Sequence, residues 1–138
     1  MSNLGMLYAS RNRIVNDIGF TRTQISVVTD EITRLRTAVN SLQGSISDLQ
    51  TTKKKIENFS IDKNRWKGEN ASTFSNKYST YESSVNNFHR SADNALEGVQ
   101  DDLRRAEDRK TSLSNSLTGL QGSLNTVDRQ IKWAQRSE

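Results

Sequence analysis

Apolar residues recur at alternating steps of three and four along most of the chain, the spacing that is typical of a helix packed against another helix. In the first half, a regular row consists of Ile25, Val28, Ile32, Leu35, Val39, Leu42, Ile46, Leu49 and Ile56. Lys53 interrupts this row once, and the same register extends back to Leu4 with polar exceptions at Arg11 and Thr21. The pattern predicts one long helix over about residues 3–59.

A second row begins at Phe74 and continues to Ala134. Its members are Phe74, Tyr78, Tyr81, Val85, Phe88, Ala92, Leu96, Val99, Leu103, Ala106, Lys110, Leu113, Leu117, Leu120, Leu124, Val127, Ile131 and Ala134. The two successive steps of four from Phe88 through Ala92 to Leu96 form a stutter, which locally unwinds a supercoil. This row predicts a second helix over about residues 69–136.

The segment between the rows is rich in residues that favour turns and helix caps, namely Asp62, Asn64, Gly68 and Asn70. It predicts a turn over about residues 60–68. Two long helices joined by a short link run antiparallel. We therefore expect residues 1–138 to form a single all-α domain, an elongated antiparallel helical hairpin with coiled-coil-like packing and a Trp-x-Gly turn.

Composition agrees with a narrow core, because only 32% of the residues are hydrophobic and the mean hydropathy is −0.80. A two-helix hairpin buries one stripe of each helix, and most helix stability comes from tertiary packing. We therefore expect helices of a partner chain to pack against this one.

Apolar residues outside the rows are candidates for that contact. Met6, Phe20 and Val27 share one position of the heptad, with Arg13 at the same position between them. They either bind a partner or widen the core-facing side of the first helix. Trp133, beside the second row, is a fourth candidate, or part of a packed terminus together with Tyr8.

Residues for catalysis or for cofactor and metal binding are scarce. Cysteine is absent, which excludes thiol nucleophiles and thiolate ligands, and His89 is the single histidine. Asp101 and Asp102 alternate with arginines, as solvated helix residues do. We expect no enzymatic activity, no cofactor and no metal.

Charge and hydropathy narrow the remaining classes. The net charge of +4 comes entirely from residues 1–65, and the run Lys53–Lys55 is interpreted as a solvated helix turn, so no nucleic-acid partner is expected. No apolar stretch approaches about 18 residues, and the first residues lack a basic region followed by an apolar one. Neither a transmembrane helix nor a cleaved signal peptide is expected.

The most distinctive motif is Trp66-Lys67-Gly68, followed by Phe74. A tryptophan in a turn needs a surface against which to bury its ring, and glycine permits a close backbone approach. The ring is therefore either a plug that seals the end of the hairpin or a docking element.

The string from Trp66 to Phe74, with Gly68 between them, resembles the hallmark of the WXG superfamily of ESAT-6-like proteins, which are helical hairpins exported by type VII secretion systems. The long helices make the chain most similar to YwqH-like proteins, which resemble accessory partners of LXG-domain toxins in Gram-positive bacteria. The chain departs from the family's export signal, a Tyr-x-x-x-Asp/Glu motif after the second helix of a partner. Tyr78 and Glu82 have this spacing, but they fall at the start of the second helix.

The resemblance implies a targeting factor or chaperone that binds the helical N-terminal domain of an LXG-type toxin, with a second small helical protein as a further candidate partner. Trp66 and Gly68 would then be read by the secretion ATPase, and the chain would be cytoplasmic before export. The alternative is a self-associating structural coiled-coil rod or tether, and homo-oligomers of the isolated chain are compatible with both hypotheses.

Overall fold

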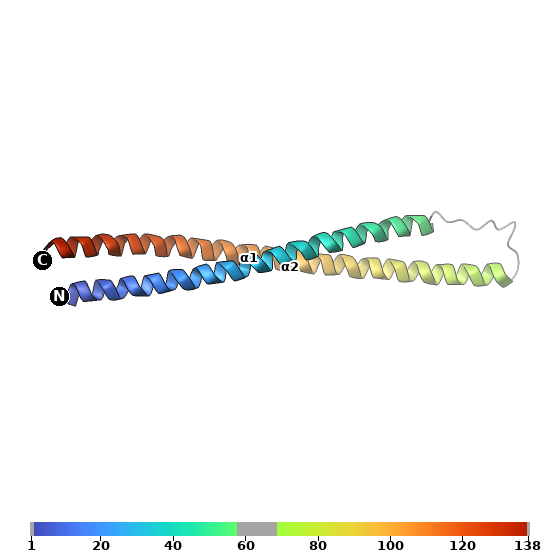
Figure 1. Ribbon diagram of the computed structural model, residues 1–138. Helices are drawn as coiled ribbons and strands as arrows, with labels where there is room; N and C mark the ends of the chain where they lie inside the picture. The colour runs from blue at the N-terminus through green and yellow to red at the C-terminus, as the bar shows by residue number, and fades with distance from the viewer. Residues whose placement is uncertain (1, 58–68, 138) are drawn as a thin grey trace. The chain divides into compact units, whose positions relative to one another are not determined.

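The computed structural model describes residues 2–57 and 69–137, and all of them are helical. Helix α1 spans Ser2–Glu57 and helix α2 spans Glu69–Ser137 (Figure 1). These two ranges contain no strand, so the protein is an all-α helical hairpin. The predicted turn, including Trp66 and Gly68, lies outside the described residues.

Contacts across the hairpin show that the helices are antiparallel. The Arg11 side chain lies 2.8 Å from Asp128, and the Arg109 side chain lies 2.8 Å from Glu31. A later residue of α1 is thus paired with an earlier residue of α2. Contacts group into two compact units, which are unit 1 (Met1–Arg34 with Leu103–Glu138) and unit 2 (Leu35–Asp102).

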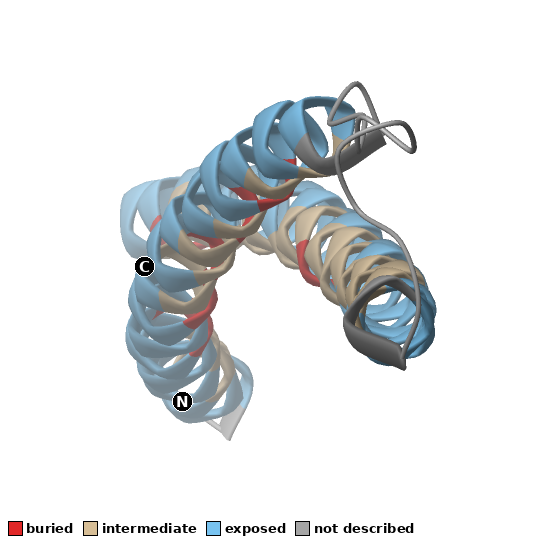
Figure 2. Ribbon diagram, turned by 90° about the vertical axis from the view of Figure 1, so that its right-hand side faces the viewer, coloured by how far each residue is buried: buried red, intermediate tan, exposed pale blue. Residues whose placement is uncertain are grey.

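The core of unit 1 is the seam, by which we mean the row of side chains on each helix that faces the other helix of the same unit. Its buried members are Ile18, Thr21, Val28, Ile32, Ala106 and Ile131 (Figure 2). All of them stand in the predicted rows, so the heptad register of unit 1 is confirmed. No large side chain of the described residues is fully buried, which makes the seam narrow.

The core of unit 2 is thinner and differs from the prediction on α2. Val39 and Ile46 of α1 are buried as predicted. Tyr81 and Phe88, which were predicted in the row, are instead 54% and 67% exposed. Glu82 and His89 are partly buried in their place. Consequently the stutter predicted at Phe88 is absent, since the inward steps from Glu82 onward alternate regularly between three and four.

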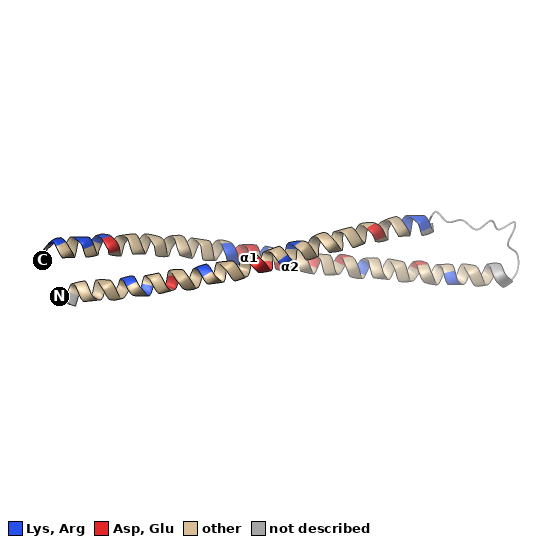
Figure 3. Cartoon of the chain, in the orientation of Figure 1, with Lys and Arg blue, Asp and Glu red and all other residues tan. Residues whose placement is uncertain are grey.

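Charged residues of both signs are interspersed along the two helices (Figure 3). The run Lys53–Lys55 lies near the carboxyl end of α1, with Lys54 and Lys55 exposed in the last turn. Cations are favourable there because the helix dipole places partial negative charge at that end. In the described part of the chain, neither helix is long and apolar enough to cross a membrane.

Candidate partner-binding surface

Three of the residues proposed from the sequence form an exposed line on α1, which we call the apolar stripe. Met6, Phe20 and Val27 are 68%, 65% and 58% exposed, respectively. Arg13 occupies the heptad position between Met6 and Phe20, and residues seven apart follow one line along a supercoiled helix. The alternative that these side chains widen the seam is therefore wrong for the isolated chain.

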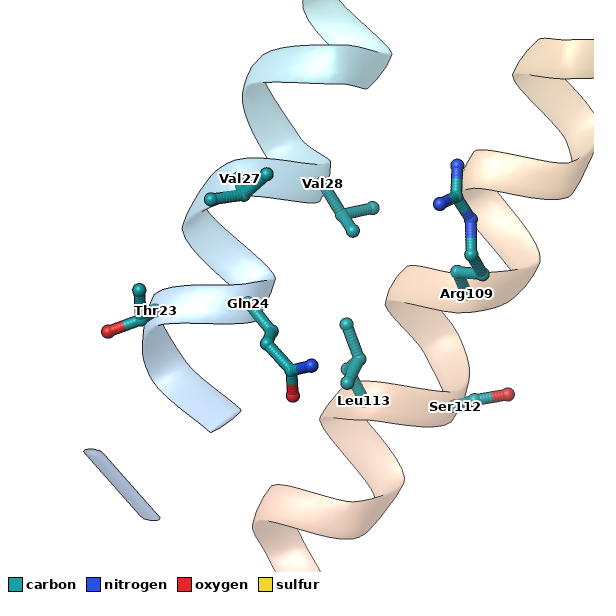
Figure 4. Close-up of a pocket in the computed structure, with 7 residues that line it drawn as sticks. All are labelled: Thr23, Gln24, Val27, Val28, Arg109, Ser112 and Leu113. Carbon is teal, nitrogen blue, oxygen red and sulfur yellow. The ribbon is translucent and has the colours of Figure 1, made fainter. Parts of the chain in front are cut away.

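A groove runs beside the stripe between the two helices of unit 1. It has a volume of about 400 Å³ and is lined by Thr23, Gln24, Val27 and Val28 of α1 and by Arg109, Ser112 and Leu113 of α2 (Figure 4). In the close-up, Val28 and Leu113 extend into the space between the helices, and Gln24 extends toward α2. The groove thus has an apolar floor that continues into the seam.

An ion pair joins the two helices beside this groove. The Nη2 atom of Arg109 donates a hydrogen bond to the Oε1 atom of Glu31 over 2.8 Å. Both side chains are partly solvated, so such a pair contributes roughly 0.2–1 kcal/mol at most. Its value here is positional, because it shows that these positions of α1 and α2 lie on the same face of unit 1.

The α2 side of this face carries small residues. Further along α2, the heptad position of Arg109 is occupied by Ser116 and Ser123, and that of Ser112 by Gly119. All three of these residues are exposed. A Cβ atom added to Gly119 would meet no other atom within 4 Å. The α1 side of this face therefore carries large apolar side chains, and the α2 side carries small, mostly polar ones.

Trp133 occupies the same heptad position of α2 as Ser112 and Gly119, nearer to the carboxyl end of the helix. Trp133 is 71% exposed, so the packed-terminus interpretation is wrong for the isolated chain. Close to it in sequence, Gln135 Nε2 donates a hydrogen bond to Tyr8 Oη over 2.8 Å, which joins the free ends of both helices. Trp133 therefore extends the face that contains the groove toward the termini.

Phe74 and Tyr78, two motif residues that the structure describes, lie in unit 2. Phe74 is partly buried and stacks on Tyr78, with ring centroids 6.2 Å apart and planes inclined by 18°. Two further aromatic residues, Tyr81 and Phe88, are exposed, although the sequence analysis placed them in the core. The signal that could have found them is the register of the long row downstream, which assigns the inward position to His89.

The His89 side chain is partly buried and lies beside an acidic residue of the same helix. Its Nδ1 atom lies 3.1 Å from an Asp93 carboxylate oxygen one turn further along α2. Within the described residues, no group of three or more His, Cys, Asp or Glu side chains is arranged to hold a metal ion.

Comparison with known proteins gives one result at the level of the family. A search of curated proteins finds no match, and a search of solved structures finds none. The sequence model of the YwqH-like family matches residues 9–129, which include Phe20, Val27 and the whole groove. The chain therefore belongs to the YwqH-like family.

Proposed function

We propose that this protein is a non-enzymatic partner of a secreted toxin. It binds the helical N-terminal domain of an LXG-type toxin and, as a targeting factor or chaperone, helps to present that domain for export by type VII secretion. The observation that carries the proposal is the apolar stripe, which lies outside the seam of a hairpin whose own core is narrow.

The energetic argument concerns what an isolated hairpin leaves unburied. Exposed apolar patches larger than scattered single residues mark interaction sites. Complete burial of side chains such as Met6, Phe20 and Val27 is worth roughly 1.5–3 kcal/mol each before the cost of association. A helix of the partner would cover these side chains and pack against the hairpin as a third helix.

The family adds support of a different kind. YwqH-like proteins resemble accessory partners of LXG-domain toxins, and the match covers both helices. A second small helical protein would complete the complex if the toxin domain leaves further apolar surface exposed. Trp66 and Gly68, with the Trp-x-Gly spacing of the WXG superfamily, would belong to the surface that the secretion ATPase reads.

Co-expression with the N-terminal domain of an LXG-type toxin encoded beside the gene tests the proposal. We expect a stable complex by size-exclusion chromatography with light scattering. At a free toxin concentration of about 100 times the dissociation constant, the hairpin should gain about 2.7 kcal/mol. For a domain of this size, that gain raises the melting temperature by roughly 10 °C.

The same measurements separate the proposal from a structural rod. A self-associating rod would be a stable homodimer whose melting temperature depends on its own concentration and does not respond to the toxin domain. That result would reject the toxin-partner function and favour the tether.

A further inference from the structure

We infer that unit 1 binds one amphipathic, acidic helix of the partner along Phe20 and Val27, with partner carboxylates against Arg13 and Arg34. The inference rests on the proposed function and specifies its contact surface. The docking face consists of the apolar stripe, the groove beside Val27 and four small residues of α2, namely Ser112, Ser116, Gly119 and Ser123.

The shape of this face suits a helix. Phe20 and Val27 are seven residues apart on one line of α1, which corresponds to about 10 Å along the helix axis. A helix lying alongside would meet them with apolar residues at steps of three and four. The small residues opposite, with open space at Gly119, permit the axial separation of roughly 8–10 Å at which helices pack.

The groove provides an anchoring point within this face. Val27 and Val28 border it on α1 and Leu113 borders it on α2, so its floor is apolar. A volume of about 400 Å³ accommodates a large apolar side chain inserted from the partner helix. Anchors of this kind, surrounded by weaker contacts, carry most of the binding energy of an interface.

Charge determines which helix fits. The heptad position of the stripe reads Met6, Arg13, Phe20, Val27 and Arg34, so a cation stands on either side of the Phe20–Val27 pair. Both arginines are exposed, and neither side chain forms an ion pair or a hydrogen bond with the described part of the chain. This holds even though an aspartate lies one helical turn from each of them along α1. Carboxylates on the partner helix would complement both arginines.

The same spacing disfavours a second copy of this chain as the occupant. In an antiparallel pairing of two stripes, Phe20 of one copy meets Val27 of the other, and Arg13 then meets Arg34. In a parallel pairing, each arginine meets its own counterpart. Both arrangements place like charges opposite each other, and the repulsion makes binding of a second copy less favourable. The geometry therefore favours a different, acidic helix.

Two pairs of variants test the inference with the toxin's N-terminal domain as the probe. The apolar test is Phe20→Ser with Val27→Ser, and its matched control is Val15→Ser, an exposed valine on the other side of α1. We expect the dissociation constant to rise at least about 100-fold in the double variant and less than about twofold in the control, by titration calorimetry.

The charge test reverses Arg13 and Arg34 to glutamate. Its control reverses Arg22 of α1 and Lys132 of α2, which are exposed, belong to unit 1 and occupy heptad positions outside the docking face. We expect at least about tenfold weaker binding for the first pair and a reduced dependence of its affinity on salt, because screening acts on the attraction that the reversal removes. The control removes the same amount of positive charge and should bind within about twofold of the unaltered chain.

A cysteine-labelling experiment tests the same docking face if one of the substituted variants fails to fold. The chain has no cysteine, so Ser112→Cys in the groove and Ser26→Cys on the opposite side of α1 each give a single reactive thiol. The toxin domain should slow modification of the first thiol at least about tenfold and leave the second unchanged, because only the first would be covered.

The outcomes distinguish this inference from the proposed function. If the unaltered chain does not bind the toxin domain, the proposed function fails. If it binds and both test pairs match their controls, with Ser112→Cys unprotected, the function stands and this docking face is wrong. If the chain alone is a dimer that Phe20→Ser with Val27→Ser disperses, a second copy occupies the face and the inference is overturned.

Discussion

At the scale of single residues, His89 and Phe88 are the most informative pair. His89 takes an inward position on α2, although its neighbour Phe88 is the more apolar of the two and is 67% exposed. The Nε2 atom of His89 and the Oδ1 atom of Asn86 are buried without a hydrogen-bond partner in the described structure. A buried polar atom without a partner costs about 1–3 kcal/mol, so this part of unit 2 is weakly stabilised.

The substitution His89→Leu should therefore stabilise the isolated chain by about 1 kcal/mol, because it removes an unsatisfied polar atom from an inward position. The expected rise in melting temperature is roughly 3–5 °C, measured by circular dichroism. The cost of losing the contact with Asp93 is small, since that carboxylate is half exposed.

Phe88→Ser is the matched comparison, and it should change the stability by less than about 0.5 kcal/mol because the ring is exposed. The opposite ranking, with Phe88→Ser strongly destabilising and His89→Leu unfavourable, would place Phe88 in the seam and contradict the observed register.

At the scale of the helices, the sequence predicted the inward row of α1 throughout its described length and that of α2 from Ala92 onward. It went wrong at Tyr81 and Phe88 because both Phe88 and His89 fit between Val85 and Ala92. Hydrophobicity favours the phenylalanine. The long regular row from Ala92 to Ala134, however, sets the rotation of a continuous helix, and that rotation turns His89 inward.

The partner-binding candidates on α1 could be predicted because they share one heptad position. The α2 wall of the docking face could not, because periodicity shows which residues of a helix face inward but not which residues of the other helix lie opposite. That register becomes visible only in cross-helix contacts such as Arg109 with Glu31. The same holds for Arg13, because residues distant in sequence decide whether its side chain has a partner within the described ranges.

The prediction at the scale of the helices concerns a glycine in the interior of α2. A glycine in a helix interior is about 1 kcal/mol less favourable than alanine, and a Cβ added at Gly122 would meet no atom within 4 Å. Gly122→Ala should raise the stability by about 0.5–1 kcal/mol in chemical denaturation. Its affinity for the toxin domain should stay within about twofold, since the heptad register places Gly122 outside the docking face. A destabilised variant would show that the helix requires glycine there.

At the scale of the whole molecule, the residues proposed for two tasks are separate in sequence. The apolar stripe and the groove belong to unit 1, which is formed by the two ends of the chain. Trp66 and Gly68 fall within the sequence range of unit 2. If unit 1 holds the toxin and the Trp-x-Gly motif is read by the secretion machinery, substitutions in the two should give different defects.

Trp66→Ala should therefore reduce export of the toxin while leaving the complex intact. We expect the variant to retain the toxin domain in a pull-down within about twofold, and secreted toxin to fall at least about tenfold, because a docking ring at an interface is a dominant contact. Phe20→Ser with Val27→Ser is the complementary control, because it should abolish the complex and thereby export as well. Unchanged secretion by Trp66→Ala would refute a docking role and leave the ring as a structural plug, for which the expected sign is a lower melting temperature. Loss of the complex itself would instead assign Trp66 to toxin binding, so a pull-down and a secretion assay on the same variant decide among the three roles.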